Sequence, residues 1–318
     1  MRRILAPILA SLLVLAGCGG GDSESSDTSG PSVDTKFGSV DVPADPQRVV
    51  ALGWGDAETA LALGVQPVGA SDWVEFGGTG VGPWAEDLYD EAPEIIATME
   101  PDYEAIAALE PDLILDTNSS GEQERYDRLS EIAPTVGVPE GGDNYLTTMD
   151  QQVDLVAEAL GKEDEGKSLL DDLDQTFEDA AKDHPEFDGK SVTVAAKTSE
   201  GWGAYVEASS RVQVMERLGF TQSSKIDESK AEGFSVPVSE ENLETLDADV
   251  LLTFPIYIPD ADVTDDEAYQ RIPAVEDGRS LVFTDDMDEL RKAFSLNSIL
   301  SAKYAAENLP EKLAKIVK

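Results

Sequence analysis

The hydrophobic pattern is strongest over residues 163–183, where it predicts one long amphipathic helix. Apolar side chains recur there at helical spacing, and acidic residues occupy the opposite face. Gly161 precedes the stretch and His184-Pro185 follows it, and both are typical of helix ends. A helix of this length spans about 30 Å, so it is either one wall of a single domain or a connector between two. The chain on either side favours a connector.

Two similar segments flank this predicted helix. Residues 104–115 (EAIAALEPDLIL) and 241–252 (ENLETLDADVLL) both begin with a glutamate, continue in a helical pattern and end in a short apolar strand. Each follows an earlier apolar, β-branched segment, at residues 48–53 and 191–196. Strands and helices that alternate in this way, twice over, predict an α/β protein with two related Rossmann-like lobes joined by a single long helix.

The N-terminal residues are predicted to be a targeting signal and a tether. Arg2 and Arg3 precede an apolar run too short to span a bilayer, and Leu15-Ala16-Gly17-Cys18 follows. This box resembles a bacterial lipoprotein signal, and the alternative is an ordinary secretory signal with a chance cysteine. The resemblance implies that Cys18, the only cysteine, becomes the lipid-modified N-terminus, which anchors the protein outside the cytoplasmic membrane. The expected parts are a signal peptide at 1–17, a flexible tether at 18–36, lobes at 37–161 and 185–318, and the connecting helix at 162–184.

The amino-acid composition limits the functions that this chain can have. A formal net charge of −42 argues against a general nucleic-acid binder, because phosphate binding needs clustered Lys and Arg. It predicts a solvated acidic surface, with selection for a cationic or neutral ligand as the alternative. The one histidine, His184, lies at a predicted helix end, and the sequence has no Gly-x-Ser-x-Gly elbow and no Gly-rich loop ending in Gly-Lys-Ser/Thr. Zinc or manganese capture would need several His or Cys. These features favour a protein that is not an enzyme and has no metal site, although a carboxylate pair cannot be singled out among so many acids.

Tryptophans follow the predicted strands of the first lobe. Trp54 and Trp73 come directly after strands, and Trp84 lies in a Gly-rich segment. In open α/β sheets ligands bind beyond the carboxyl ends of the strands. We therefore expect these rings at a ligand site, the alternative being that each packs onto its own lobe. The second lobe is predicted to carry a longer loop at 197–211, with further aromatic and basic residues.

Five segments occur in order along the chain, at 48–53 (RVVALG), 62–70 (ALGVQPVGA), 104–115, 238–252 (VSEENLETLDADVLL) and 294–300 (FSLNSIL). Together they resemble the solute-binding proteins of ABC importers for iron-siderophores, haem and cobalamin. The resemblance implies the helical-backbone periplasmic-binding-protein fold, with the ligand in a shallow and largely preformed cleft between the lobes. It also implies that one glutamate of each lobe docks against arginines of the membrane permease, and Glu104 and Glu241 occupy that place.

The function that this resemblance implies is extracytoplasmic capture of a ferric siderophore by a monomer, with no cofactor of its own. A siderophore already encloses its Fe(III), so the protein needs an aromatic cradle and a few hydrogen-bond donors. Arg211 and Arg291 are expected to donate to hydroxamate or carboxylate oxygens. The scarcity of cations favours a ferric hydroxamate over an anionic catecholate. The expected ligand-binding residues are Trp54, Trp73, Trp84, Trp202, Tyr205, Arg211, Tyr257 and Arg291.

Two alternatives remain open. One is a haem- or cobalamin-binding member of the same family, in which Tyr205 or Tyr257 would serve as the axial ligand of haem. The other belongs to a different class, an anchored cell-wall glycan hydrolase or adhesion module. The exact siderophore and the permease are not identified by the sequence.

Overall fold

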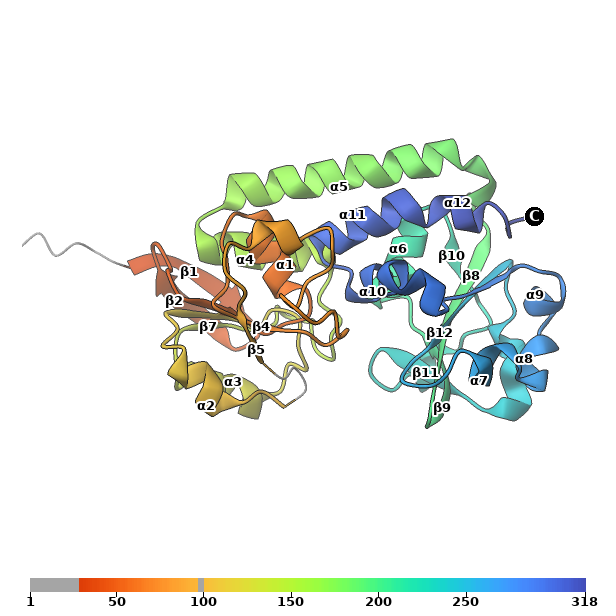
Figure 1. Ribbon diagram of the computed structural model, residues 1–318, viewed down its shortest axis with the longest axis horizontal. Coiled ribbons are helices and arrows are strands. Elements are labelled where there is room, and N and C mark those ends of the chain that lie inside the picture. The colour runs from red at the N-terminus through yellow and green to blue at the C-terminus, as the bar shows by residue number, and fades with distance from the viewer. Residues whose placement is uncertain (1–28, 97–99) are drawn as a thin grey trace, which may run out of the picture.

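The computed structural model describes residues 29–96 and 100–318. These residues form two α/β lobes side by side, with a long helix lying along both (Figure 1). None of the helices in these residues is long and apolar enough to cross a membrane. Cys18 and the predicted signal peptide lie outside the described residues, as does the first part of the predicted tether.

The first lobe is built on a five-stranded parallel sheet, in the order β5-β4-β3-β6-β7. The apolar runs that predicted buried strands form its two central strands, β3 and β6. Its elements are β1 (Ser29–Thr35), β2 (Gly38–Pro43), β3 (Val49–Ala51), α1 (Asp56–Ala62), β4 (Gly69–Ser71), η1 (Glu86–Leu88), β5 (Glu94–Ile96), α2 (Tyr103–Ala108), β6 (Leu113–Leu115), α3 (Gln123–Ser130), β7 (Thr135–Val136) and α4 (Met149–Leu160).

The second lobe has a mixed sheet in the order β11-β9-β8-β12-β13, with β10 paired to β8. Its elements are η2 (Pro185–Phe187), β8 (Ser191–Thr198), β9 (Gly201–Tyr205), α6 (Ser210–Arg217), β10 (Thr221–Gln222), η3 (Glu228–Lys230), β11 (Ser235–Val238), η4 (Glu240–Leu246), β12 (Val250–Pro255), α7 (Ala261–Thr264), α8 (Glu267–Gln270), α9 (Pro273–Glu276), β13 (Ser280–Val282), η5 (Asp285–Met287), α10 (Asp288–Leu296), α11 (Ile299–Asn308) and α12 (Pro310–Leu313).

The repeated segments occupy equivalent places in the two lobes. In the first lobe α2 leads into β6, which pairs with the lobe's first sheet strand, β3. In the second lobe η4 leads into β12, which pairs with β8 in the same parallel sense. The sequence similarity therefore reflects the same strand–helix–strand unit in each lobe.

Helix α5 (Glu163–Asp183) joins the lobes. It buries Leu173 and Phe177, and its first turn is acidic, which complements the positive end of the helix dipole. Helices α4 and α11 both pack against it, and Figure 1 shows α11 lying beneath it.

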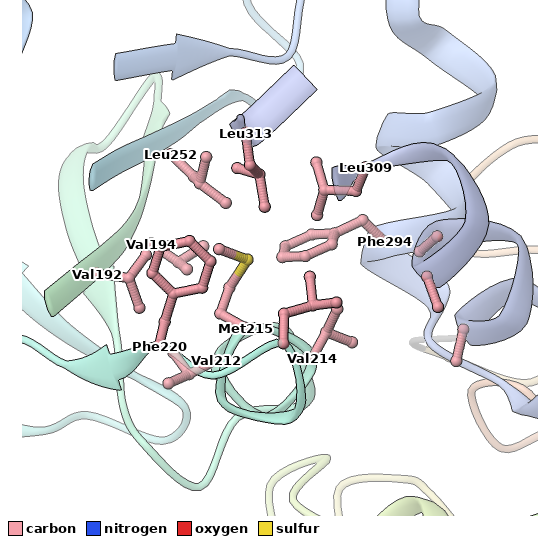
Figure 2. Packing of buried hydrophobic residues seen from close by; sticks show 14 of the residues in the cluster. Val192, Val194, Val212, Val214, Met215, Phe220, Leu252, Phe294, Leu309 and Leu313 are labelled. Carbon is pink, nitrogen blue, oxygen red and sulfur yellow. The ribbon is translucent and has the colours of Figure 1, made fainter. Parts of the chain in front are cut away.

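The core behind the cleft is continuous across the lobe junction. Phe294 of α10 stacks near Phe254 and Phe283. It belongs to the same buried cluster as the valines of β8 and the apolar side chains of α6 (Figure 2). The same cluster of buried residues includes Met149 and Val153 of α4, which belongs to the first lobe. Interiors packed in this way resist shear, so the lobes have a largely fixed relation along α4, α5 and α11.

The predicted tether is wrong for its last part. Residues 29–35 form strand β1, which pairs antiparallel with β2. Val33 is fully buried and joins a core cluster with Val42 and residues of α4. The polar composition of the segment hid this strand, because only one side of the β1–β2 hairpin faces the core.

Shortening Val33 to alanine is therefore expected to lower the free energy of unfolding by roughly 2 kcal/mol, through lost burial and a residual cavity. Urea unfolding of the protein without its lipid measures this effect. Ser32→Ala is the matched control, since Ser32 is exposed on the same strand. Equal stability of the two variants would show that β1 is not part of the folded core.

The predicted long loop at 197–211 is also wrong. Residues 197–198 end β8, and residues 201–205 form strand β9, which makes a hairpin with β8 and pairs with β11 on its other edge. Two glycines in the short segment Gly-Trp-Gly-Ala-Tyr weakened the strand signal, because glycine is poorly represented in strands.

Candidate ligand-binding cleft

Three stacked aromatic rings mark the first lobe's side of the cleft. The Trp54 ring lies between Trp73, with ring centres 3.9 Å apart, and Tyr145, with ring centres 4.0 Å apart. Trp54 follows β3 and Trp73 follows β4, which are neighbouring parallel strands. Their carboxyl ends meet at one edge of the sheet, where ligands bind in folds of this kind.

The main chain of Trp54 is held by the neighbouring loop and by α4. Its N–H donates to the carbonyl of Asn118, 2.8 Å away. Its carbonyl accepts from Asn118 Nδ2 at 3.2 Å and from Gln152 Nε2 at 2.7 Å. Hydrogen bonds to this loop and to α4 therefore hold the main chain from which the Trp54 ring projects.

Arg211 faces this stack from the second lobe. It lies in α6 and is 5% exposed. Its guanidinium carbon is 4.5 Å from the ring centre of Tyr205 and 5.7 Å from those of Trp73 and Phe254. Phe234 completes the contact between the lobes, with its ring centre 6.3 Å from that of Trp54 and 6.0 Å from that of Tyr205.

Arg211 has no acidic partner within the described part of the chain. No carboxylate there lies within ion-pair distance of it, and its buried Nε has no hydrogen-bond acceptor among those residues. Aromatic faces attract a cation, but they do not replace a hydrogen-bond acceptor. A buried guanidinium that lacks an acidic partner and an acceptor for its Nε is suited to bind a ligand through the ligand's oxygen atoms.

A cavity of about 470 Å³ opens in front of Arg211. Arg291 and Lys292 lie at its wall, and both form ion pairs with Asp288. Burial works to raise the pKa of Asp288, but hydrogen bonds from these two cations outweigh it and lower the pKa overall. Of the three cations lining the cavity, Arg211 alone therefore lacks a neutralising acid. The cavity is lined from both lobes by Trp73, Arg211, Phe254, Tyr257, Asp288, Arg291 and Lys292, among others.

Two contacts cross the mouth of the cleft. Lys292 Nζ donates to the carbonyl of Glu75 at 2.8 Å, and Tyr257 Oη donates to the carbonyl of Trp73 at 3.4 Å. Tyr257 is 79% exposed and has a φ of 53°, an unusual conformation for a residue other than glycine. Its ring is therefore largely in solvent, at the edge of the cavity that it lines.

A second cavity, of about 500 Å³, lies between α4, α5 and α6. Its charged lining comprises Asp150, Asp174, Glu216 and Arg217, and Arg217 is already paired with Asp174. It has no stacked aromatic rings. An iron chelate that presents oxygen atoms would meet mainly carboxylates there, so the cleft at Arg211 is the better candidate site.

Trp84 and Trp202 are not part of the aromatic stack, which corrects their predicted role as ligand-binding residues. The Trp84 ring packs against Tyr304 of α11, and its Nε1 donates to Glu58 at 3.0 Å. Trp202 is 4% exposed and stacks on Tyr269 in the core of the second lobe. Alternate residues of β9 face opposite sides of the sheet, so Tyr205 lies near Arg211 while Trp202 points away from it.

Sequence reasoning missed four residues of the cleft, namely Tyr145, Phe234, Phe254 and Lys292. Phe254 is the last residue but one of β12, so the strand-end argument that found Trp54 applies to it directly. Tyr145 lies further from a strand end, in the segment between β7 and α4. Phe234 and Lys292 carry no such signal, because only the tertiary fold brings their segments to the cleft.

Glu104 and Glu241 are exposed, each in the first turn of its short helix. The side chain of Asp102 caps α2 just before Glu104. Within the described residues no group of three or more His, Cys, Asp or Glu side chains is placed to hold a metal ion.

The lobes, the connecting helix and the cleft between them define a solute-binding protein. The family model for periplasmic binding proteins matches residues 49–287, and the chain belongs to this family. The predicted fold class and family resemblance are thereby confirmed.

Named relatives and solved structures agree with this assignment. The "Probable siderophore-binding lipoprotein YfiY" of Bacillus subtilis is 31% identical over 264 residues, which cover 79% of this chain and 78% of that protein. The Fe(3+)-citrate-binding protein YfmC of the same organism is 26% identical, with coverage of 78% and 77%. Streptococcus pneumoniae PiaA in complex with ferrichrome gives a TM-score of 0.77 at 26% identity, covering 90% of this chain and 98% of that one. A periplasmic solute binding protein from Mycobacterium smegmatis gives 0.76 at 30% identity, covering 92% and 100%.

Proposed function

We propose that this protein captures a ferric siderophore of the hydroxamate type outside the cytoplasmic membrane and delivers it to an ABC permease. The observation that carries the proposal is Arg211, a buried cation without an acidic partner among the described residues, which lines the cavity beside Trp73, whose ring stacks on Trp54. A ferric chelate presents oxygen atoms to a guanidinium and apolar surface to aromatic rings. The names of the relatives support the same ligand class.

The charge of the cleft favours a hydroxamate. Arg291 and Lys292 already share Asp288, so Arg211 is the cation left to meet a ligand. One free guanidinium suits the carbonyl oxygens of a neutral ferric hydroxamate. A highly anionic ferric catecholate would need more uncompensated positive charge when it is taken out of water.

The proposal also covers how the protein is anchored, its oligomeric state and its contact with the permease. The protein is anchored through lipidated Cys18, works as a monomer and holds no cofactor besides its ligand. It is a carrier rather than an enzyme. Glu104 and Glu241 dock it on the permease, and their equivalent places in the two lobes support this role.

Tryptophan fluorescence, titrated with a ligand panel, tests the proposal. Ferrichrome is expected to quench the emission saturably at submicromolar concentration, because Trp73 lines the cavity and Trp54 stacks on it, so both rings would lie close to the iron chelate. Iron-free chelator, ferric citrate and ferric enterobactin are expected to bind more weakly.

Other results of this titration would support a different function. A saturable response to haemin with a Soret band, or to cobalamin, would support the alternative within the family, and Tyr257 is exposed at the rim for a haem iron. No response to any of these ligands would overturn the proposal and point to glycan binding or hydrolysis.

A further inference from the structure

A buried acid lies directly beneath the Trp54 loop. Asp56, at the start of α1, is 0% exposed. Its Oδ2 accepts from the main-chain N–H groups of Gly53 and Thr117, both at 3.0 Å. Its Oδ1 accepts from the Thr117 hydroxyl and, at 2.7 Å, from Gln152 Nε2. The same Gln152 amide donates to the carbonyl of Trp54. One carboxylate thus ties the loop after β3 to the loop after β6 and to α4.

The charge on Asp56 has no cation to neutralise it in the described residues. The acid on the adjoining loop, Asp116, is itself paired with Arg125 of α3. Burial raises the pKa of Asp56 to about 6, although the hydrogen bonds from Thr117 and Gln152 oppose that rise. A carboxyl whose folded pKa is raised contributes stability at low pH and loses it as the pH rises through about 6. The ionised form therefore lowers stability at neutral pH, as expected for a residue kept for function.

We propose that Asp56 and Gln152 are positioning residues that hold the Trp54 ring in its stack, and that ligand affinity depends on the negative charge of Asp56. This inference rests on the proposed function, since the affinity in question is that for a ferric chelate. Hydrogen bonds to an ionised acceptor are stronger than those to a neutral one. Neutralising Asp56 weakens four of them together, and the loop that carries Trp54 loses its fixed position.

Asp56 is the acid whose protonation is expected to change the hydrogen bonds of the Trp54 loop, because the groups around it are paired, uncharged or bonded elsewhere. Asp116 faces it from the loop after β6 and raises its pKa further, but the guanidinium of Arg125 stays on Asp116. Gln152 on α4 and Thr117 carry no charge. Glu58, two residues further along α1, accepts instead from Trp84 and from Ser298 at the start of α11.

The first test compares the pH dependence of ferrichrome binding in three proteins. In the wild type, affinity is expected to fall about tenfold as the pH is lowered from about 7.5 to about 5. Asp56→Asn is expected to bind about tenfold more weakly at the higher pH and to show a flat profile. Glu58→Gln is the matched control, because it removes the other buried acid of α1 and should keep the slope of the wild type. A wild-type slope retained in Asp56→Asn would overturn the inference.

The second test needs no ligand. Stacked indole rings give an exciton signal in circular dichroism, and loss of that signal in Trp54→Phe assigns it to the Trp54–Trp73 pair. The signal is expected to drop in Asp56→Asn and in Gln152→Met while the helical signal is retained. Gln152→Met also serves if Asp56→Asn does not fold.

The two tests separate the two claims. If the wild-type protein binds no iron chelate, the proposed function fails, and the exciton signal alone decides the positioning role. If the wild type binds and both variants keep its exciton signal and its pH profile, the positioning role fails while the proposed function stands.

Discussion

Replacing Arg211 with methionine is expected to weaken ferric hydroxamate binding about 100-fold while the protein stays folded. Two hydrogen bonds from a charged donor account for a loss of that size. Methionine keeps apolar contact with Tyr205 and Phe254, whose rings surround the guanidinium. Removing an unpaired buried charge stabilises the fold, and losing the attraction of the aromatic faces offsets that gain. The free energy of unfolding should therefore change by less than about 1 kcal/mol.

Arg291→Met is the matched control for this experiment. Arg291 lines the same cavity but is paired with Asp288, and a solvent-accessible ion pair of this kind contributes about 1 kcal/mol or less. Its loss should change affinity less than about fivefold. Calorimetric titration with ferrichrome and urea unfolding measure both quantities for both variants. If Arg291→Met lost more affinity than Arg211→Met, the ligand would sit at the rim of the cleft, and Arg211 would not be its main donor.

The strongly periodic parts of the chain were predictable from sequence. Helix α5 is 21 residues long, which gives its amphipathic pattern several turns over which to repeat. The strands β3, β6, β8 and β12 are buried in parallel pairings, and such strands appear as continuous apolar runs. Once these strands were placed, the rule that ligands bind beyond their carboxyl ends led to Trp54 and Trp73.

Side-chain direction was not predictable to the same degree. Trp202 and Tyr205 are three residues apart, both are buried, and they face opposite sides of one strand, so Trp202 stacks on Tyr269 while Tyr205 packs against Arg211. The sequence could show this only if β9 were recognised as a strand, and its glycines concealed it. The place of Trp84 depends on Glu58 and Tyr304, from helices far apart in the sequence.

The buried acids on α1 could not be recognised from the sequence for another reason. The chain contains 65 Asp and Glu residues, so no composition or spacing distinguishes Asp56 and Glu58 from acids on the surface. Both have a raised pKa, mainly because burial removes them from water. Only the packed structure shows that Glu58 meets Ser298 of the C-terminal segment, while Asp56 meets the Trp54 loop.

The same abundance of acids makes the permease-docking prediction a strict one. Glu104 and Glu241 are two exposed acids among many, and their distinction is their equivalent place in the two lobes. If they dock against arginines, reversing both charges places like charges in contact, which costs several kcal/mol. The double variant Glu104→Arg, Glu241→Arg is therefore expected to lower siderophore-dependent ATP hydrolysis by the reconstituted permease more than about 100-fold. Ferrichrome affinity should be unchanged, because neither residue lines the cavity.

A control with the same change in net charge separates local docking from general electrostatics. Glu110 and Glu244 are exposed in the same two repeated segments, and reversing both alters the total charge equally. This variant should retain at least about half of the stimulated ATP hydrolysis, because charges outside the contact act mainly through long-range attraction, which salt screens. If both double variants lost activity equally, and if added salt abolished the difference from wild type, the acidic surface as a whole would attract the permease. Loss confined to Glu104 and Glu241 would locate the docking contacts on these two side chains, one on each lobe.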